Sequence, residues 1–264
     1  MIQTIIKHKP TRLFIILSGI FVTTALIAEF IGVKIFSLEA SLGFKPAAIH
    51  LLGSSYSFNL TCGVLLWPVV FIMTDIINEY YGQKGVKFLS WMTITLIAFG
   101  FLMVFLALQT APNDWWVTSK KAVGIDDMNV AFNGIYGQGL GIIIASIFAF
   151  LIAQLVDVFI FHKIKKATGE NKIWLRATGS TLVSQLIDSF VVLIIAFYLY
   201  PKFVSGQGEP WPFNQLIAIC FVNYMYKFVV AIILTPVIYV VHTIIEKYLG
   251  KEDAAAMKKA AMGQ

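Results

Sequence analysis

The residues most able to do chemistry in this sequence are ionisable side chains that fall inside long apolar segments. Residues 66–79 (LWPVVFIMTDIINE) contain Phe71, Asp75, Asn78 and Glu79, whose spacing predicts that they share one face of a helix. An aromatic ring, two carboxyl groups and an amide on one stripe would suit the lining of a polar binding site. Glu79 also has a simpler interpretation, in which its carboxylate reaches the membrane surface near Lys84 or Lys87.

Two later segments repeat a short polar pattern. In residues 154–157 (QLVD) and 185–188 (QLID), an amide and a carboxyl group lie three positions apart on one helical face. Thr181 and Ser184 extend the second stripe. These side chains can line a site, or they can tie helices together by hydrogen bonds, as Ser, Thr and Gln do in membrane proteins. The sequence leaves both interpretations open.

A single cation lies near the middle of the last apolar segment. An isolated Lys227 ammonium in an apolar environment would lose its proton or find a partner, and Asp188 or Asp75 would serve as that partner. Arg176 begins an apolar segment, and Glu29 falls near the end of the first one, where an interfacial position is a simple alternative. Charges in such places usually face a protein interior or a cavity.

The composition identifies the environment of these charges. Of 264 residues, 58% are hydrophobic and only 13% are charged, whereas soluble domains have about 45–50% apolar and about 25% charged residues. This excludes an ordinary soluble enzyme and a disordered chain. The long apolar runs also argue against an outer-membrane barrel, which alternates apolar and polar positions.

The apolar excess resolves into segments long enough to cross a bilayer, which requires about 20 helical residues. We therefore predict an all-α polytopic membrane protein with six transmembrane helices. The predicted spans are residues 12–33, 60–80, 87–109, 138–161, 177–200 and 215–242.

The net charge of +6 supplies the orientation. The basic residues lie at the ends of the apolar segments, which a bilayer explains better than a nucleic-acid partner does. Fourteen of the twenty Lys and Arg residues fall on one side of the six spans and five on the other. The positive-inside rule then predicts that both termini are cytoplasmic, as an even number of spans requires.

Several other classes of site have little support. Cys62 and Cys220 are too few for a disulfide framework, although one bridge between them is compatible with the predicted topology. The four histidines show no metal-binding spacing, and the sequence has no P-loop, so we expect neither a metal nor a cofactor. Residues 34–58 form a long loop of undecided conformation, and we expect the polar tail, residues 250–264, to be a frayed helix or disordered.

Three segments resemble a known family. Residues 73–82 (MTDIINEYYG) and residues 176–189 (RATGSTLVSQLIDS) resemble two signatures of the queuosine precursor transporter family, also called the vitamin uptake transporter family. Tyr226 and Lys227, followed by Thr235, Pro236 and Tyr239, are similar to its last helix. The resemblance covers about residues 60–242, which would form the core of a single transporter domain spanning residues 1–264. Residues 83–86 depart from the family pattern.

The resemblance implies import of 7-deazaguanine bases, such as 7-cyano-7-deazaguanine and 7-aminomethyl-7-deazaguanine, across the bacterial inner membrane for salvage into tRNA queuosine. A carboxylate can accept both N–H donors of a guanine-like edge, an amide or ammonium can donate to its oxygen, and an aromatic face can stack on its rings. The expected substrate-binding residues are Trp67, Phe71, Asp75, Asn78, Glu79, Tyr80, Gln154, Asp157, Arg176, Gln185, Asp188 and Lys227.

The expected mechanism is alternating access around a site between residues 60–80, 177–200 and 215–242. One alternative is a substrate-capture subunit that depends on a separate ATP-driven module. Another is an intramembrane enzyme that uses Asp75 and Asp188 as a carboxylate pair, although no Gly-x-Gly-Asp motif precedes either residue. The sequence decides neither the energy source nor the oligomeric state.

Overall fold

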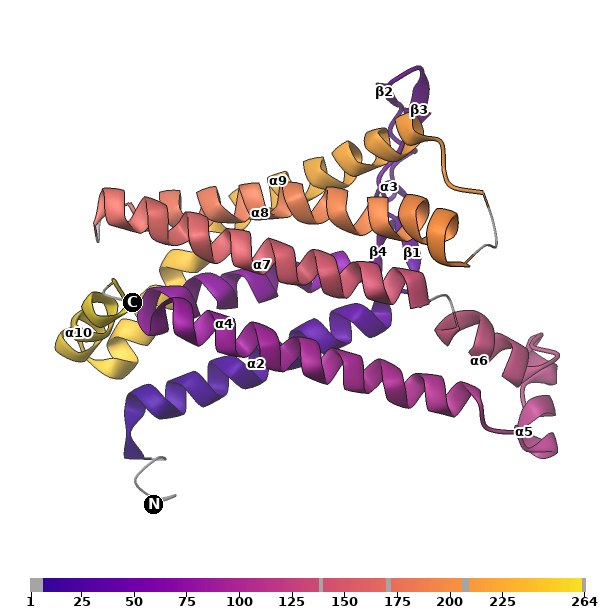
Figure 1. Cartoon of the computed structure of the whole chain (residues 1–264), viewed down its shortest axis with the longest axis horizontal. Coiled ribbons are helices and arrows are strands. Elements are labelled where there is room, and N and C mark those ends of the chain that lie inside the picture. Colours follow the sequence, from indigo (N-terminus) through magenta and orange to yellow (C-terminus); the bar gives the residue numbers. More distant parts are fainter. Residues whose placement is uncertain (1–6, 138–139, 170–171, 206–208, 263–264) are drawn as a thin grey trace.

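The computed structural model describes residues 7–137, 140–169, 172–205 and 209–262, and it is dominated by long helices (Figure 1). Within these residues, five helices are long and apolar enough to cross a membrane. They are α2 (Lys9–Ile31), α4 (Trp67–Leu108), α7 (Leu140–Thr168), α8 (Ile173–Ile194) and α9 (Phe213–Leu249). The π-helical turns η3 (Ile195–Leu199) and η4 (Pro201–Ser205) extend α8.

The count of five differs from the six predicted spans because two of them, residues 60–80 and 87–109, fall largely within α4. This element has 42 residues, and its backbone is not helical at Gly82, where φ is 69° and ψ is −172°. Glycine tolerates this conformation because it has no Cβ atom. In Figure 1 the first part of α4 runs toward the end of the bundle that carries α10, and the later part runs back toward α5.

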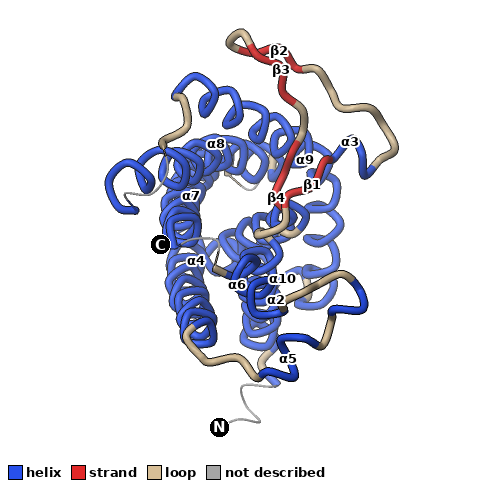
Figure 2. Tube along the Cα trace, turned by 90° about the vertical axis from the view of Figure 1, so that its right-hand side faces the viewer, coloured by secondary structure: helices blue, strands red, loops and turns tan. Residues whose placement is uncertain are grey.

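The loop after α2 contains short strands that the sequence did not predict. Strand β1 (Ile35–Ser37) pairs antiparallel with β4 (Asn59–Thr61), and β2 (Ile49–Leu51) pairs with β3 (Ser54–Tyr56). The hairpin of β2 and β3 projects beyond the helices (Figure 2). Helix α3 (Leu38–Ser41) supplies Glu39, whose Oε1 accepts hydrogen bonds from the backbone N–H groups of Ala47 and Phe58 at 3.1 and 2.9 Å. The Glu39 carboxylate therefore links α3 to the backbone at Ala47 and at Phe58.

Short helices close the two ends of the bundle. At one end lie α5 (Asp114–Thr118), the 3₁₀ turn η2 (Lys121–Val123) and α6 (Met128–Tyr136), and a further 3₁₀ turn, η1 (Cys62–Leu65), precedes α4. At the other end, α10 (Lys251–Met262) packs against α4 and buries Ala254 and Ala261. The tail therefore forms an ordered helix, and the expectation of a frayed or disordered segment was wrong for residues 251–262.

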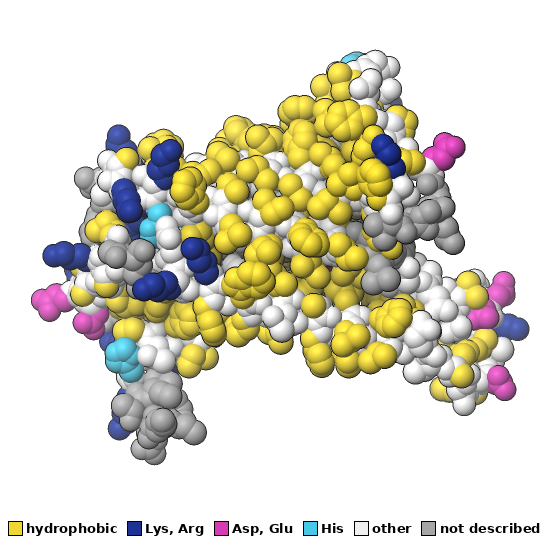
Figure 3. Space-filling view, viewed as in Figure 1, with side chains coloured by type: hydrophobic (Ala, Val, Ile, Leu, Met, Phe, Trp, Pro, Cys, Tyr) yellow, Lys and Arg dark blue, Asp and Glu magenta, His cyan; other side chains and the backbone are white. Residues whose placement is uncertain are grey.

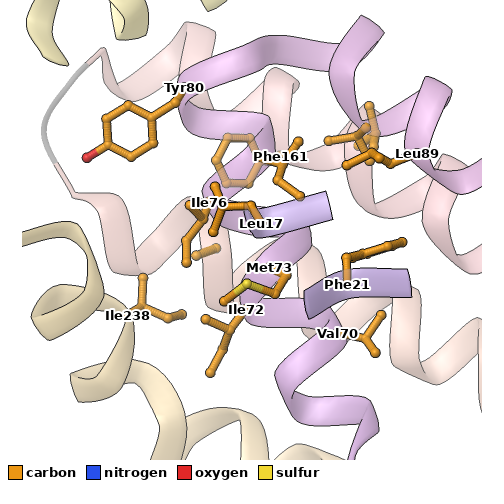
Figure 4. Close-up of a cluster of buried hydrophobic side chains, with 14 of the residues drawn as sticks. Leu17, Phe21, Val70, Ile72, Met73, Ile76, Tyr80, Leu89, Phe161 and Ile238 are labelled. Carbon is orange, nitrogen blue, oxygen red and sulfur yellow. The ribbon is translucent and has the colours of Figure 1, made fainter. Parts of the chain in front are cut away.

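The hydrophobic core joins α2, α4, α7 and α9 (Figure 4). Phe21 of α2, Ile76 of α4 and Phe161 of α7 are each no more than 1% exposed. The outer face of the bundle is also apolar: Phe99, Phe159 and Ile233 are more than half exposed. Figure 3 shows hydrophobic side chains over the middle of the molecule and Lys and Arg side chains gathered at the end that carries α10. This distribution suits a protein surrounded by lipid, because so large an exposed apolar surface is unfavourable in water.

Both cysteines are free: Cys62 is half-buried in η1 and Cys220 is buried in α9. The disulfide bridge that the sequence allowed is therefore not formed.

Candidate functional site

A pocket of about 500 Å³ lies between α4, α8 and α9. We call it the central pocket. Its walls come from α4 and from α8 and α9, which follow much later in the sequence, and these helices include parts of the three segments between which the sequence predicted a site. Its lining consists of Val64, Trp67, Pro68, Phe71, Ile72, Asp75, Thr178, Thr181, Gln185, Tyr226, Lys227, Val230, Ala231, Leu234 and Ile238.

Two polar groups in the central pocket lack hydrogen-bond partners. Asp75 is 2% exposed and Gln185 is 3% exposed, yet Asp75 Oδ1 and Gln185 Nε2 contact no donor or acceptor within the described residues. The other carboxylate oxygen, Asp75 Oδ2, accepts a long hydrogen bond of 3.5 Å from the Thr181 hydroxyl. Buried polar groups in proteins are nearly always paired. An unpaired acceptor and an unpaired donor in one pocket therefore indicate a place for a polar ligand.

Aromatic rings supply the apolar side of the central pocket. The ring centroids of Trp67 and Phe71 are 6.3 Å apart, with the planes tilted by 40°. Both rings line the pocket because they are four residues apart at the start of α4. Flat ligands stack well on such surfaces.

Lys227 forms an ion pair with Asp188. The Lys227 ammonium donates to Asp188 Oδ2 at 2.6 Å, and the two side chains are 14% and 20% exposed. The sequence left Asp188 and Asp75 open as partners, and the fold selects Asp188. Asp75 therefore keeps its unpaired oxygen in the central pocket.

A second pocket, of about 1310 Å³, adjoins the first and shares Val64, Trp67 and Lys227 with it. We call it the strand-side pocket, because strands β1 and β4 contribute to its wall. Glu29 lies in this wall and accepts a hydrogen bond from the Ser146 hydroxyl. Glu29 was absent from the predicted site residues, although a carboxyl group inside an apolar helix was a signal for it. Asp188 lines this pocket rather than the central one.

Glu79 and Arg176 lie in a separate buried charge cluster. Two Arg176 nitrogens, Nη2 and Nε, donate to the two Glu79 carboxylate oxygens at 2.7 and 3.1 Å, and the Lys165 ammonium lies 3.1 Å from Glu79 Oε2. All three side chains are at most 1% exposed. Sequence reasoning missed Lys165, which it assigned to a cytoplasmic loop. Its position two helical turns after Asp157 was the available signal.

The remaining predicted site residues contact other polar side chains, and none of them lines either pocket. Asn78 Oδ1 lies 2.8 Å from His162 Nε2, and the Tyr80 hydroxyl lies 3.1 Å from His242 Nδ1. Gln154 Nε2 lies 3.1 Å from the Thr74 hydroxyl oxygen, which lies 3.3 Å from Gln154 Oε1. The Ser184 hydroxyl donates to Asp157 at 3.2 Å. No group of three His, Cys, Asp or Glu side chains suited to a metal occurs in the described part of the chain.

Long apolar helices, an apolar exterior and an internal pocket with buried charges define a multi-pass membrane protein with a small-molecule site, which is the form of a transporter. Residues 61–241 match the family described as "Putative vitamin uptake transporter", and the chain belongs to this family. It is therefore a membrane transporter and not an enzyme, as the sequence signatures predicted.

Similar proteins carry a more specific description. The chain is 28% identical over 187 residues to the "Probable queuosine precursor transporter" of Bacillus subtilis (strain 168), covering 70% of this chain and 72% of that protein. It is 23% identical over 188 residues to the "Queuosine precursor transporter" of Escherichia coli (strain K12), covering 70% and 73%. A Haemophilus influenzae protein described as a "Probable queuosine precursor transporter" is 24% identical over 181 residues, covering 69% and 67%. No solved structure matches the chain.

Proposed function

We propose that this protein imports 7-deazaguanine precursors of queuosine across the bacterial inner membrane, with the central pocket as the substrate site. The observation that carries the proposal is that one pocket is lined by both an unpaired Asp75 carboxylate oxygen and an unpaired Gln185 amide nitrogen. A guanine-like base presents two adjacent N–H donors and a carbonyl oxygen along one edge. Asp75 would accept from the donors and Gln185 would donate to the oxygen, so the ligand would satisfy both buried groups.

The remaining walls suit the rest of such a base. Trp67 and Phe71 offer aromatic faces to its two fused rings. Lys227 lines both the central and the strand-side pocket and is paired with Asp188. A substrate that moves from one pocket to the other would therefore contact this ion pair.

We further propose six membrane crossings with both termini in the cytoplasm, with α4 crossing twice around Gly82. An ideal helix of 42 residues would extend about 63 Å, twice the thickness of a bilayer core. The start of α2 and all of α10 lie at the same end of the bundle, where Lys and Arg side chains gather (Figures 1 and 3). Transport would proceed by alternating access around the central pocket, and the whole chain would act as one transporter domain.

The proposal is tested in bacteria that cannot synthesise the precursor and depend on imported base. We expect Asp75→Asn to reduce queuosine in tRNA at least tenfold, because the amide can no longer accept both N–H donors. Asp126→Asn is the matched control, since Asp126 is exposed in a loop, and both variants should reach the membrane at the wild-type level. Normal queuosine in the Asp75→Asn strain would refute the site.

Uptake by the purified protein in liposomes tests whether this chain transports the base without other subunits. Import of 7-cyano-7-deazaguanine by this chain alone would show that no ATP-driven module is required. Strict dependence on added partner subunits would instead make the chain a substrate-capture subunit. Competition among the cyano, aminomethyl and free bases in the same assay would rank the substrates.

A further inference from the structure

A second buried carboxyl group lies behind the central pocket. Asp157 of α7 is 0% exposed and lines neither pocket. Its Oδ1 lies 3.2 Å from the Ser184 hydroxyl, and the Ser180 hydroxyl is a second polar neighbour of this carboxyl group. Its Oδ2 has no partner at hydrogen-bond distance within the described residues. Burying this carboxyl group with one unpaired oxygen costs free energy. Asp157 does not line the proposed substrate site, so binding of the substrate does not explain that cost.

The hydrogen-bond geometry around Ser184 favours a protonated Asp157. The Ser184 oxygen lies 3.2 Å from Asp157 Oδ1 and 3.1 Å from the Thr181 carbonyl oxygen. A serine hydroxyl has one hydrogen, so it cannot donate fully to both when both are acceptors. If Asp157 carries a proton, Asp157 donates to Ser184 and Ser184 donates to the carbonyl. Both contacts are then satisfied at once.

The same residues of α8 connect Asp157 to the substrate site. Thr181 donates its hydroxyl to Asp75 Oδ2 at 3.5 Å, and its carbonyl faces Ser184. Polar groups one turn apart on α8 thus link the carboxyl group in the pocket with the one behind it. Negative charges on two neighbouring buried carboxyl groups would repel each other.

The Arg176 guanidinium acts electrostatically on Asp75, but it forms no ion pair with either carboxyl group. Neither Asp75 nor Asp157 forms an ion pair within the described residues. The buried charged and histidine side chains of α4, α7, α8 and α9, apart from Asp75 and Asp157, contact other partners. Lys165 and Arg176 bind Glu79, Lys227 binds Asp188, His162 contacts Asn78 and His242 contacts Tyr80.

We propose that Asp157 is a proton-binding site that couples uptake of the substrate to uptake of one proton. The inference rests on the proposed function. The substrate needs Asp75 in its charged form to accept two N–H donors, and two charges in this dry interior would repel each other. A proton on Asp157 removes that repulsion, so the proton and the substrate bind cooperatively. When the proton or the substrate is released toward the cytoplasm, the protein binds the remaining one more weakly.

Proteoliposomes test this coupling, with 7-cyano-7-deazaguanine as the transported probe and the membrane potential held at zero. With one proton per substrate, a gradient of one pH unit, acid outside, supports accumulation of up to about tenfold. We expect the wild type to accumulate the base under this gradient. Asp157→Asn, which is permanently neutral, should exchange labelled for unlabelled base at a rate near that of the wild type and should not accumulate it.

Two further variants keep the test decisive. Asp126→Asn makes the same carboxyl-to-amide change at an exposed residue, and this variant should accumulate the base like the wild type. Ser184→Ala removes the hydroxyl that contacts Asp157 Oδ1, and it should reduce accumulation severalfold while leaving exchange in place. It replaces Asp157→Asn if that variant does not reach the membrane.

The outcomes separate this inference from the proposed function. Accumulation by Asp157→Asn at the wild-type level would overturn the coupling role, as would wild-type accumulation driven by a sodium gradient alone. Exchange of base with no response to any gradient would overturn the coupling and leave the substrate site standing. An absence of exchange in the wild type would refute the proposed function and the inference with it.

Discussion

Lys227 donates to Asp188 at 2.6 Å, and this ion pair stands where the two pockets of the bundle meet. Lys227 comes from α9 and lines both pockets, whereas Asp188 comes from α8 and lines only the strand-side pocket of the two. The pair therefore joins two helices of the proposed substrate site and also forms part of the wall that a substrate would pass. These two roles can be separated by experiment.

The first prediction concerns this pair. Lys227→Ala should lower the melting temperature in detergent and abolish uptake, because Asp188 is left as a partly buried, unpaired charge. The exchanged pair, Lys227→Asp with Asp188→Lys, should regain most of the stability and little of the uptake, since the charge facing the central pocket has changed sign. Full recovery of uptake by the exchanged pair would show that the ion pair only holds the helices together.

The second prediction concerns the buried charge cluster. Glu79→Gln should destabilise the protein by about 3–5 kcal/mol, because the buried Arg176 and Lys165 lose their carboxylate partner. Protein that still folds should bind the base with nearly wild-type affinity, since Glu79 lines neither pocket. Thermal unfolding and equilibrium binding on the same sample check both parts. A stable variant that had lost binding would place Glu79 in the substrate site.

The third prediction concerns how Asp75 recognises the substrate. Hydrogen bonds to a charged group contribute about 1.5–3 kcal/mol each. A base that lacks the exocyclic amine should therefore bind the wild type about 10- to 100-fold more weakly than the complete base. Asp75→Asn should distinguish the two bases far less. If the variant discriminated as strongly as the wild type, another residue would hold the amine.

The fourth prediction concerns the break in α4. Gly82→Ala should destabilise the protein by about 1–3 kcal/mol, because φ of 69° with ψ of −172° is open essentially to glycine alone. Gly19→Ala is the matched control: Gly19 lies within α2, and an added Cβ would contact no atom within 4 Å. The control should be neutral or slightly stabilising. Membrane abundance and thermal unfolding of the two variants would give the comparison, and equal behaviour would show that the break at Gly82 is not required.

Much of the architecture could be predicted because lipid imposes simple rules on sequence. Apolar length identified the helices, and charges inside apolar segments marked buried polar sites. The sequence divided this region into two spans, residues 60–80 and 87–109, and the structure joins most of both into α4 with a non-helical backbone at Gly82. The strands among residues 35–61 and the docking of α10 depend on contacts with distant segments, such as β4 with β1 and α10 with α4.

The sequence by itself determined which side chains share a helical face, and only the tertiary structure decided what each face meets. Asp75 and Glu79 lie on one stripe, but Glu79 is four residues farther along, which is about 6 Å along the helix axis. That distance carries it past the central pocket to Arg176 and Lys165, while Asp75 lines the pocket together with Gln185. Helical periodicity is local, whereas the partner of a buried charge depends on how separate helices pack.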